Sequence, residues 1–396
     1  MFKLFSRKEI EDKTKDFMSW AEINLDHLEY NYNQMGKIVN GSTTILPIVK
    51  ADAYGHGVIP VCKKLKTLGV ETVAVATLPE ALHIAKFDLN LSILILLTGL
   101  PEQAETIVKH DFIQTAANYP MAQALSTEAE KQNKTCRIHL KVDTGMNRLG
   151  FFPEEATETI RKIMKLKNLK VEGIYTHFSS SFIEDKDYTV LQWNKFNDIL
   201  RELEKNDIDI TYKHISNSAS IVDAGFIKLN MVRPGIMLYG LYPHDYLKNI
   251  IQLKPALSLK SKIISIKQVT KDSSVSYGRT HTSKKGSWLA VAPIGYADGY
   301  SRRLSHNISV LIKGEFYPVV GNICMDQIII DVTNSKNLKI GDEVTLIGTD
   351  SGKTIAVEEL AEKTNTINYE ITCDINKRLP KVYIENGEIT EIETIY

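Results

Sequence analysis

Residues 45–57 read ILPIVKADAYGHG, an apolar run that ends on a single lysine, Lys50, and continues into a turn of small residues. β-Branched side chains followed by glycines are typical of a buried strand that runs into a strand-to-helix turn. A lysine at the carboxyl end of a buried parallel strand lies where α/β barrels carry their catalytic groups. Taken alone, Lys50 is better explained as the point where the strand reaches solvent, because most lysines are exposed.

More short apolar runs follow this one, and amphipathic stretches separate them. Two of these stretches, residues 153–166 and 185–206, have the spacing of helices. Eight strands alternating with helices over about 200 residues predict a (β/α)8 TIM barrel. A doubly wound open sheet is the alternative, but the GxGxxG turn expected after its first strand is absent. The eight predicted strands are residues 44–50, 72–77, 92–99, 112–116, 137–145, 171–178, 211–216 and 229–240.

The pattern changes after Pro243, and from Leu257 onward short strands follow one another through tight turns. This is typical of a mostly antiparallel β domain, here interrupted by one helix at residues 354–364. An earlier strand, residues 19–25, is left over once eight strands close the barrel, so we expect it to pair with the second domain. The predicted parts are a charged N-terminal extension of residues 1–17, a barrel of residues 18–250 and a β domain of residues 251–396.

Composition restricts the class of protein. The 48 basic and 48 acidic side chains balance, which argues against a nucleic-acid or membrane-surface partner, since either normally leaves a basic excess. The longest apolar run, residues 93–97, is too short to span a bilayer, and the first residues lack the apolar core of a signal peptide. The four cysteines are far apart and form no disulfide or zinc-binding pattern, which predicts a reducing, cytoplasmic environment and no metal site.

Several other strings contain residue types that carry chemistry. Taken singly, most have an ordinary explanation: Arg148 as a surface arginine, Ser218 as a turn residue and His177 as a core histidine. Arg233 is less ordinary, because an arginine between apolar strand residues is rare unless it is paired or bound to a ligand. The strings are KVDTGMNRLG at 141–150, THF at 176–178, NSAS at 217–220, MVRPGI at 231–236, VSYGR at 275–279, PIGYADGY at 293–300, CMDQ at 324–327 and TINYE at 366–370.

In this order, from Trp20 to about Tyr383, the strings resemble those of the bacterial alanine racemases, a family of pyridoxal-phosphate enzymes. The resemblance implies that Lys50 holds pyridoxal 5'-phosphate as a Schiff base. It also implies that Arg233 meets the ring nitrogen and that His177 lines the ring. The residues it implies at the cofactor's phosphate are Tyr54, Ser218, Gly235 and Ile236.

The resemblance also implies roles around the substrate. Arg148 matches an arginine that contacts the cofactor's phenolic oxygen and the substrate carboxylate, and Lys141 matches a lysine that is carbamylated in some members and then holds this arginine. Tyr277 is implied as the second catalytic group beside Lys50. Tyr369 matches a cofactor-site tyrosine that narrows the substrate entrance. The remaining positions are Met325, implied at the substrate, and Tyr296 and Asp326 in supporting places.

Residue chemistry supports the same assignment. The α-proton of an amino acid is too weakly acidic for a side chain to remove unaided, and pyridoxal phosphate supplies an electron sink. Backbone amides and hydroxyls suit its anionic phosphate. Because arginine stays protonated, Arg233 would leave the ring nitrogen without a proton of its own. A less electron-withdrawing ring stabilises a carbanion less, which disfavours transamination.

Racemisation needs proton exchange on both faces of the α-carbon. Lys50 would serve one face and Tyr277 the other, with cations along the chain from Arg233 to His177 stabilising the phenolate. The two catalytic groups lie in different predicted domains, and the resemblance implies a homodimer in which each site borrows its partner's tyrosine. The predicted activity is the interconversion of L- and D-alanine by a two-base mechanism, which supplies D-alanine for peptidoglycan.

Two rival functions stay open. The first is a serine or broad-specificity racemase, although Tyr369 argues against an enlarged pocket. The second is a non-catalytic pyridoxal-phosphate-binding barrel, which would resemble only the barrel half and would lack the tyrosine-bearing β domain. Comparing turnover of alanine and serine distinguishes the first, and a simple racemisation assay distinguishes the second.

Overall fold

The computed structural model describes residues 15–39, 41–227, 229–335 and 337–395. Most of the predicted N-terminal extension, residues 1–14, lies outside the described residues. The chain divides into two compact units. The barrel unit comprises residues 29–53 and 61–253, and the β unit comprises Met1–Leu28, Tyr54–Pro60 and Lys254–Tyr396.

The barrel unit is built on an eight-stranded sheet whose strands all pair in parallel, in the order β2-β9-β8-β7-β6-β5-β4-β3. A parallel bridge between Ile48, just after β2, and Ala74 of β3 joins the two ends of this order, so the sheet closes on itself. The predicted barrel is therefore confirmed. Its strands are β2 (Thr44–Ile45), β3 (Thr72–Val75), β4 (Ser92–Ile95), β5 (Ile113–Ala116), β6 (Cys136–Lys141), β7 (Leu169–Tyr175), β8 (Tyr212–Asn217) and β9 (Met231–Arg233).

Strands β4 and β5 show why the sequence contains short apolar runs rather than alternating ones. Three of the four residues of β4 are buried, and all four of β5 are. A parallel strand with a helix on one side and the barrel interior on the other has both faces buried, so it needs no polar face. Several of the site residues that the sequence predicts in the barrel stand at the carboxyl ends of such strands, for example Lys141 at the end of β6.

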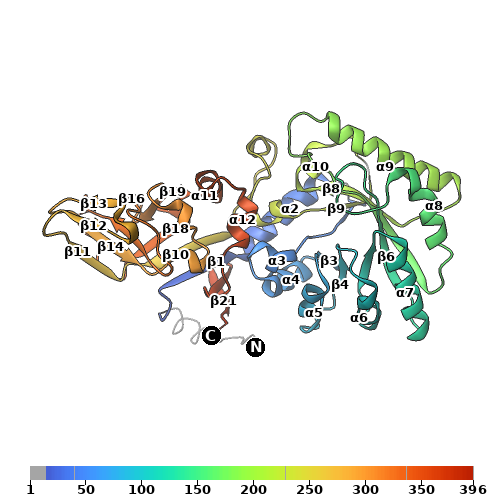
Figure 1. Ribbon diagram of the computed structural model, residues 1–396, viewed down its shortest axis with the longest axis horizontal. Helices are drawn as coiled ribbons and strands as arrows, with labels where there is room; N and C mark the ends of the chain where they lie inside the picture. The colour runs from blue at the N-terminus through green and yellow to red at the C-terminus, as the bar shows by residue number, and fades with distance from the viewer. Residues whose placement is uncertain (1–14, 40, 228, 336, 396) are drawn as a thin grey trace. The chain divides into compact units, whose positions relative to one another are not determined.

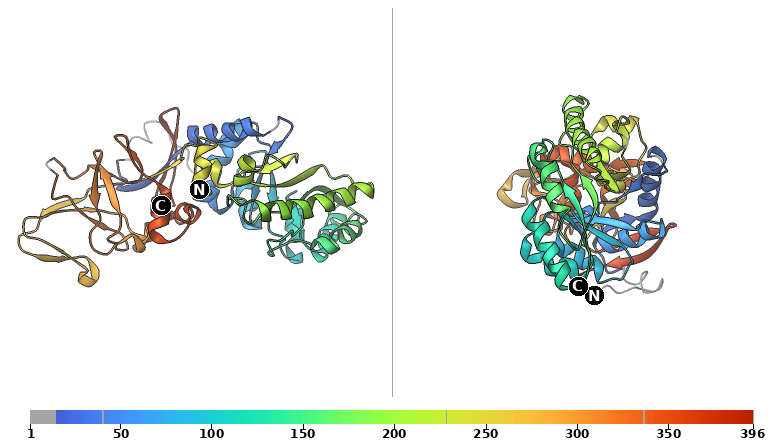
Figure 2. Two further views of the ribbon diagram at one scale, coloured as in Figure 1. Left: turned by 90° about the horizontal axis from the view of Figure 1, so that it is seen from above. Right: turned by 90° about the vertical axis from the view of Figure 1, so that its right-hand side faces the viewer.

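Helices cover the outside of the barrel strands (Figure 1), and they form the outer layer of the unit in the right-hand view of Figure 2. Polar caps mark several of their starts: the side chain of Asn118 accepts from the amide of Met121, and Pro120 lies in the first turn. The helices predicted at 153–166 and 185–206 are confirmed as α8 and α9. The helices of this half of the chain are α2 (Leu25–Ile38), α4 (Val58–Thr67), α5 (Leu78–Ala85), α6 (Ala104–Lys109), α7 (Tyr119–Lys131), α8 (Pro153–Ile163), α9 (Asp187–Lys205) and α10 (Ser218–Asp223).

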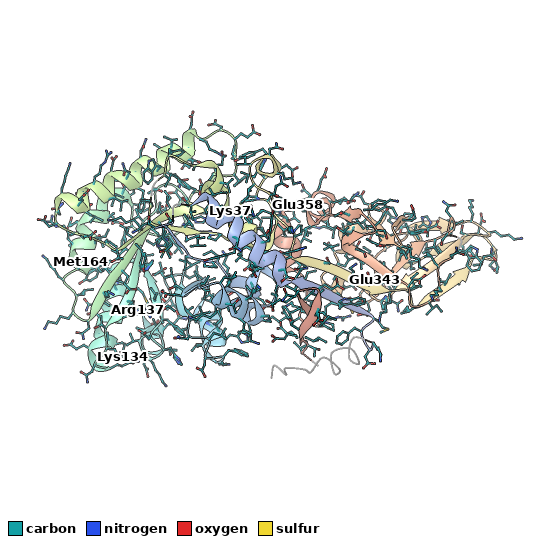
Figure 3. All side chains as sticks on the ribbon, turned by 180° about the vertical axis from the view of Figure 1, so that it is seen from behind. Lys37, Lys134, Arg137, Met164, Glu343 and Glu358 are labelled. Carbon is teal, nitrogen blue, oxygen red and sulfur yellow. The ribbon has the colours of Figure 1, made fainter. Side chains whose placement is uncertain are left out.

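The two ends of the barrel strands differ in chemistry. Figure 3 labels Lys134 and Arg137 where the chain enters β6, and Met164 where it leaves α8. At this amino end Arg137 contacts Asp111 at 3.1 Å, an ordinary partly exposed surface pair. At the opposite end β6 finishes on the buried Lys141. The buried charges Lys141 and Arg233 thus lie at the carboxyl ends of their strands, where barrels carry their functional sites.

The β unit contains a mostly antiparallel sheet, as predicted, with the path β16-β15-β18-β10-β1-β20-β21 and β19 beside β18. The strand predicted at 19–25 is β1 (Ser19–Asn24), and it pairs antiparallel with β10 and parallel with β20, which confirms its pairing outside the barrel. Further strands form the order β11-β14-β17 and the hairpin β12-β13. The bounds are β10 (Leu257–Lys262), β11 (Ser265–Gln268), β12 (Ser273–Val275), β13 (His281–Ser283), β14 (Trp288–Ala292), β15 (Ser309–Ile312), β16 (Glu315–Pro318), β17 (Ile328–Asp331), β18 (Glu343–Asp350), β19 (Lys353–Ile355), β20 (Lys381–Glu385) and β21 (Glu388–Glu393).

The helical content of the β unit differs from the prediction of one helix at 354–364. Helix α11 begins later, at Val357, and ends at Thr364, because Lys353–Ile355 pair with β18 as strand β19. A second helix, α12 (Asn368–Cys373), follows it and contains most of the TINYE string. Its first turn has no side-chain cap, so the usual sequence signal for a helix start is missing.

Within the part of the chain that the structure describes, no helix combines the length and the apolar composition that crossing a membrane requires.

Candidate active site

The residues Lys50–Tyr54 (α3) form one turn of left-handed helix shortly after the first barrel strand, which ends at Ile45 and is followed by further pairing of Ile48 and Val49 with Ala74. Ala51, Asp52 and Ala53 have φ between 52° and 55° and ψ between 47° and 51°. This conformation costs roughly 1–2 kcal/mol per residue in L-amino acids, so surrounding contacts must hold it. Within the turn, the amide of Ala53 donates to the carbonyl of Val49 at 3.0 Å. The predicted turn is present, but the helical turn that follows the strand is left-handed.

The glycines of the AYGHG string are explained by close packing inside the β unit. Gly55 and Gly57 both have φ of +85°, a region that favours glycine. A Cβ at Gly55 would overlap the carbonyl oxygen of Thr372 in α12, and a Cβ at Gly57 would overlap the hydroxyl of Tyr383 in β20. These two glycines therefore let the chain pass directly against its neighbours.

Arg233, at the end of β9, is the centre of a buried polar cluster in the barrel unit. Only 3% of the residue is exposed. Its Nη2 donates to the carbonyls of Thr176 at 2.7 Å and Ile215 at 3.0 Å. The guanidinium also lies over the ring of Tyr175, 5.1 Å from its centroid. Burial lowers the pKa of Arg233 to about 10, so the side chain is still a cation at neutral pH.

Two histidine contacts of Arg233 fix which ring nitrogens carry protons. Arginine only donates, so His214 accepts at Nδ1 from Nη1 at 2.6 Å, and His177 accepts at Nδ1 from Nη2 at 3.1 Å. Each neutral imidazole then carries its proton on Nε2. For His214 this proton points to Nδ1 of His139, 2.9 Å away. His177 keeps its Nε2–H as a donor for another group.

The histidines of this cluster are neutral because they are buried next to cations. Burial lowers the pKa of His139 to about 3, with Arg233 as the next cause. Burial and then Arg233 also lower the pKa of His214 well below its usual value. Burial lowers the pKa of His177 in the same way, and four neighbouring cations lower it further: Arg233, Lys141, Arg148 and Lys50. Lys50, Lys141, Arg148 and Arg233 are thus all close enough to His177 for their charges to affect its pKa, so five predicted residues of the barrel mouth interact electrostatically.

Lys141 is a buried amine at the end of β6, and only 6% of the residue is exposed. Its Nζ lies over the ring of Tyr175, 4.8 Å from the centroid. Burial lowers the pKa of Lys141 well below its usual value, and the charge of Arg233 lowers it further, while Asp143 acts in the opposite direction. The side chain is therefore more easily deprotonated than a surface lysine.

Asp143 organises the loop that carries Arg148. Its carboxylate accepts three backbone hydrogen bonds, from Gly145 and Asn147 at 2.9 Å each and from Arg148 at 2.7 Å. Asp143 is 4% exposed. These hydrogen bonds hold the pKa of this carboxyl below its usual range, against the effect of its burial. The aspartate of the short DTG sequence, residues 143–145, thus stabilises the loop that carries Arg148.

Backbone and hydroxyl donors meet between β8 and β9. The amide of Gly235 donates to Oγ of Ser218 at 2.9 Å, and the amide of Met237 reaches the same oxygen at 3.5 Å. Ser218 and Ile236 are buried. Ser218 opens α10, and Asn217 caps that helix by accepting from the amide of Ser220. The structure thus brings three of the four predicted phosphate residues together in the barrel unit, and the fourth, Tyr54, belongs to the β unit.

In the β unit, adjacent turns carry Tyr277, Tyr296 and Met325. The carbonyl of Tyr277 accepts from Nδ2 of Asn322 at 2.8 Å, which ties this turn to the segment before CMDQ. The amide of Tyr296 donates to the carbonyl of Cys324 at 3.1 Å, and a Cβ at Gly295 would overlap that carbonyl as well. The three strings VSYGR, PIGYADGY and CMDQ therefore form one joined surface.

Asp326 and Tyr369, the other predicted residues of the β unit, each have a defined neighbour. Arg378 bridges two aspartates: its Nη2 donates to Asp326 and its Nε to Asp298, both at 2.6 Å. Asp298 is buried and also accepts from the amide of Gly295 at 2.8 Å, so Arg378 is a support that the sequence prediction missed. The ring of Tyr369 lies 6.0 Å from that of Tyr54.

No set of three or more His, Cys, Asp or Glu side chains that could hold a metal ion occurs among the described residues. The predicted site residues therefore fall into two groups, a cationic barrel mouth in the barrel unit and a tyrosine-bearing surface in the β unit. Sequence reasoning gave no site role to His139 or His214, and Asp143 was noted only as part of the KVDTGMNRLG string. All three side chains lie in or next to strands β6 and β8.

Two family models match the chain. One is described as the N-terminal domain of alanine racemase and matches residues 23–243, and the other is described as its C-terminal domain and matches residues 256–383. An alanine racemase of Halothermothrix orenii is 46% identical over 92% of this chain and 96% of its own length. An alanine racemase of Methanococcus maripaludis is 45% identical over 92% of this chain and 98% of its own length.

Solved structures agree with these relatives. The alanine racemase of Clostridium difficile 630 superposes with a TM-score of 0.91 at 39% identity, over 96% of this chain and 98% of that one. The alanine racemase of Bacillus anthracis with bound L-Ala-P superposes with a TM-score of 0.90 at 33% identity, over 95% of this chain and 97% of that one. Both similarities extend over the barrel and the β unit together.

Proposed function

The chain belongs to the alanine racemase family, and we propose that it interconverts L- and D-alanine with two proton-transferring side chains, Lys50 and Tyr277, in sites completed by a homodimer. The observation that carries this proposal is the buried Arg233, which keeps its charge beside neutral His177 in the same electrostatic neighbourhood as Lys50. A buried, well-oriented cation without a carboxylate partner suits a ligand with a weakly basic ring nitrogen.

Members of this family use pyridoxal phosphate, and the donors of the barrel unit fit it. Arg233 offers guanidinium N–H groups to the ring nitrogen. The hydroxyl of Ser218 and the amide of Ile236 offer donors to the phosphate, and the amide of Gly235, which donates to Oγ of Ser218 at 2.9 Å, orients that hydroxyl. Lys50 supplies the amine that would hold the cofactor. The residues we assign to the cofactor are Lys50, Tyr54, His177, Ser218, Arg233, Gly235, Ile236 and Tyr369.

When bound, the cofactor supplies an electron sink that makes the α-proton of alanine acidic. Arg233 governs how strong that sink is, because a permanent cation donates a hydrogen bond without giving up its proton. His214 and the carbonyls of Thr176 and Ile215 hold the guanidinium in one orientation. A sink of limited strength favours return of the proton to the same carbon over side reactions.

Arg148 is proposed to bind the substrate carboxylate, with Lys141 in support. The loop of Arg148 is fixed by Asp143, so the arginine's backbone is held in place before substrate arrives. The lowered pKa of Lys141 increases the fraction of neutral amine, and the neutral amine is the form that reacts with carbon dioxide. A carbamate on Lys141 would turn a competing cation into an anionic partner for Arg148.

Two side chains are proposed to move the α-proton. Lys50 serves the face from which D-alanine loses its proton, and Tyr277 serves the face of L-alanine. A phenolate on Tyr277 needs nearby hydrogen-bond donors. Because Nδ1 of His177 accepts from Arg233, the proton of this imidazole is on Nε2, and this Nε2–H is proposed as one such donor. Met325, with Tyr296 and Asp326 behind it, would line the substrate side of the same surface.

A homodimer with shared sites is proposed because three predicted site residues of the β unit are exposed. In the single chain 67% of Tyr277, 51% of Met325 and 41% of Tyr296 are exposed. Proton transfer to carbon works best where water is excluded, so these side chains call for a cover that a second subunit can provide. The product, D-alanine, is proposed to serve peptidoglycan synthesis.

The proposed function is tested by incubating the purified protein and pyridoxal phosphate with L-alanine and following D-alanine by chiral chromatography. We expect conversion in both directions to an equal mixture, with alanine turned over faster than serine because Tyr369 and Tyr54 restrict the space near the cofactor. Faster turnover of serine would identify a serine or broad-specificity racemase instead. A protein that binds pyridoxal phosphate but racemises neither amino acid would be a binding barrel.

Asp143→Asn is expected to raise the KM for alanine on the order of tenfold, with a smaller effect on kcat. An asparagine has one oxygen, which would stay with Gly145 and Asn147, so its NH2 group would face the amide of Arg148. Losing a hydrogen bond to a charged group costs about 1.5–3 kcal/mol, and about 1.4 kcal/mol is tenfold in binding. Steady-state kinetics with Asp209→Asn as the control, an exposed aspartate on the same unit, measures this. An unchanged KM would contradict the role given to Asp143.

A further inference from the structure

We propose that Glu80 is a positioning residue for Lys50: its carboxylate holds the left-handed turn that begins at Lys50 and so sets the direction of the lysine side chain. The inference rests on the proposed function, because the direction of Lys50 matters to the reaction only if this lysine holds the cofactor. It concerns a residue on α5, outside every string by which the sequence resembles the family.

Backbone amides on either side of Lys50 are bonded to the same strand–helix unit. On one side, the amide of Val49 donates to the carbonyl of Ala74 in β3 at 2.8 Å. On the other side, the amide of Ala51 donates to Oε1 of Glu80 in α5 at 2.7 Å. The backbone of Lys50 is thus held before and after its Cα by one β3–α5 unit.

The second carboxylate oxygen of Glu80 has a different task. Oε2 accepts from the amides of Ala76 and Thr77 at 2.8 Å each. Thr77 in turn accepts from the amide of Glu80 at 3.4 Å, which completes a capping box at the start of α5. One carboxylate therefore caps two helices of opposite hand, and it can do so because both of its oxygens accept.

The ordinary explanation of Glu80 is that it only caps its own helix. That explanation accounts for Oε2 but not for Oε1, whose partner Ala51 lies 29 residues earlier in the chain. Ala51 is exposed and in a disfavoured conformation, so water could replace a weaker partner and let the turn relax toward ordinary backbone angles. Because Lys50 precedes Ala51 directly, such a relaxation would redirect its side chain.

Two variants separate the two tasks. Glu80→Gln has the same shape, and its single oxygen is expected to stay with the amides of Ala76 and Thr77 just before α5, which leaves its NH2 group facing the amide of Ala51. Thr77→Ala removes the hydroxyl of the α5 cap and leaves the contact between Glu80 and Ala51 in place. The first variant therefore tests the turn, and the second tests the helix cap.

The full-length chain of each variant is titrated with pyridoxal phosphate, reduced with borohydride and mapped for labelled lysines, and its thermal midpoint is recorded. We expect the label on Lys50 in all three proteins. Glu80→Gln should need on the order of tenfold more cofactor for half-labelling, as for the loss of one charged hydrogen bond. Its kcat at saturating cofactor should fall while the KM for alanine, set by Arg148, stays unchanged. Thr77→Ala should lower the thermal midpoint and label like the parent protein.

Labelling of Glu80→Gln at the parent's cofactor concentration, with the parent's kcat, would overturn the proposal. So would equal losses in Glu80→Gln and Thr77→Ala, since Glu80 would then act only as a helix cap. Either of these two outcomes would reject the role of Glu80 alone, and the proposed function would still hold if the parent protein racemises alanine. A parent protein whose label falls on another lysine would overturn the assignment of Lys50 itself, and with it the role of Glu80.

Discussion

Tyr277→Phe is expected to lower racemisation of alanine on the order of 100-fold or more, which is the usual size of a lost general acid–base group. Phenylalanine keeps the ring and removes only the hydroxyl, so the exposed turn around residue 277 should keep its backbone contact with Asn322. The proton on the L-alanine face would then have no side chain to take it up. Lys50 would still serve the opposite face.

The two faces can be measured separately in deuterated water. Exchange of the α-proton of D-alanine depends on Lys50 and should survive in Tyr277→Phe, whereas exchange from L-alanine should fall together with racemisation. Tyr317→Phe is the matched control, since it makes the same change on β16 of the same unit, outside the three turns that carry Tyr277, Tyr296 and Met325. Equal losses of exchange from both enantiomers would contradict the assignment of one group to each face.

The barrel could be predicted because its signals are local. Each buried parallel strand appears as a short apolar run, and eight of them alternate with amphipathic helices. The lysine at the end of the first run and the arginine within the last run were visible for the same reason, since charged residues stand out against apolar neighbours. The antiparallel half was equally visible from its closely spaced strands and turns.

The hand of the turn after Lys50 could not be predicted, because it depends on contacts that are distant in the chain. Alanine has no preference for positive φ. The conformation of Ala51 and Ala53 is maintained by Glu80 and by the strand segment that ends at Val49. Local sequence patterns predict a strand, a turn and a helix here, but they do not predict whether the helical turn is right-handed or left-handed.

The buried histidines were missed for a related reason. In RIHLK, His139 stands between the buried Ile138 and Leu140, and in TYKHIS, His214 stands between the half-buried Lys213 and the buried Ile215, so no polar–apolar alternation marks the inward-facing positions. Their role appears only when β6, β7, β8 and β9 are assembled in one sheet, where His214 meets Arg233 and His139 meets His214. Gly173 shows the same dependence, because a Cβ there would overlap the ring of His139 on the neighbouring strand.

Subunit complementation should restore activity from two dead proteins. Lys50→Ala lacks the cofactor lysine of the barrel unit, and Tyr277→Phe lacks the phenol of the β unit. If each site combines the Lys50 of one subunit with the Tyr277 of the other, a mixed dimer holds one site with both lesions and one site with none. A two-fold dimer makes its two sites equivalent, so only the distribution of lesions matters.

Mixing the two variants in equal amounts, after dissociation and reassociation, should make about half of the dimers mixed, so about a quarter of all sites should recover. If each chain instead completes its own site, every site in every dimer keeps one lesion and the mixture stays as inactive as its parents. Native mass spectrometry on chains of different mass verifies that exchange has occurred. The expected gain is large because each lesion alone removes a group that takes part directly in proton transfer or in holding the cofactor. A fully exchanged mixture without recovered activity would exclude the shared site and would require Tyr277 to serve its own chain's Lys50.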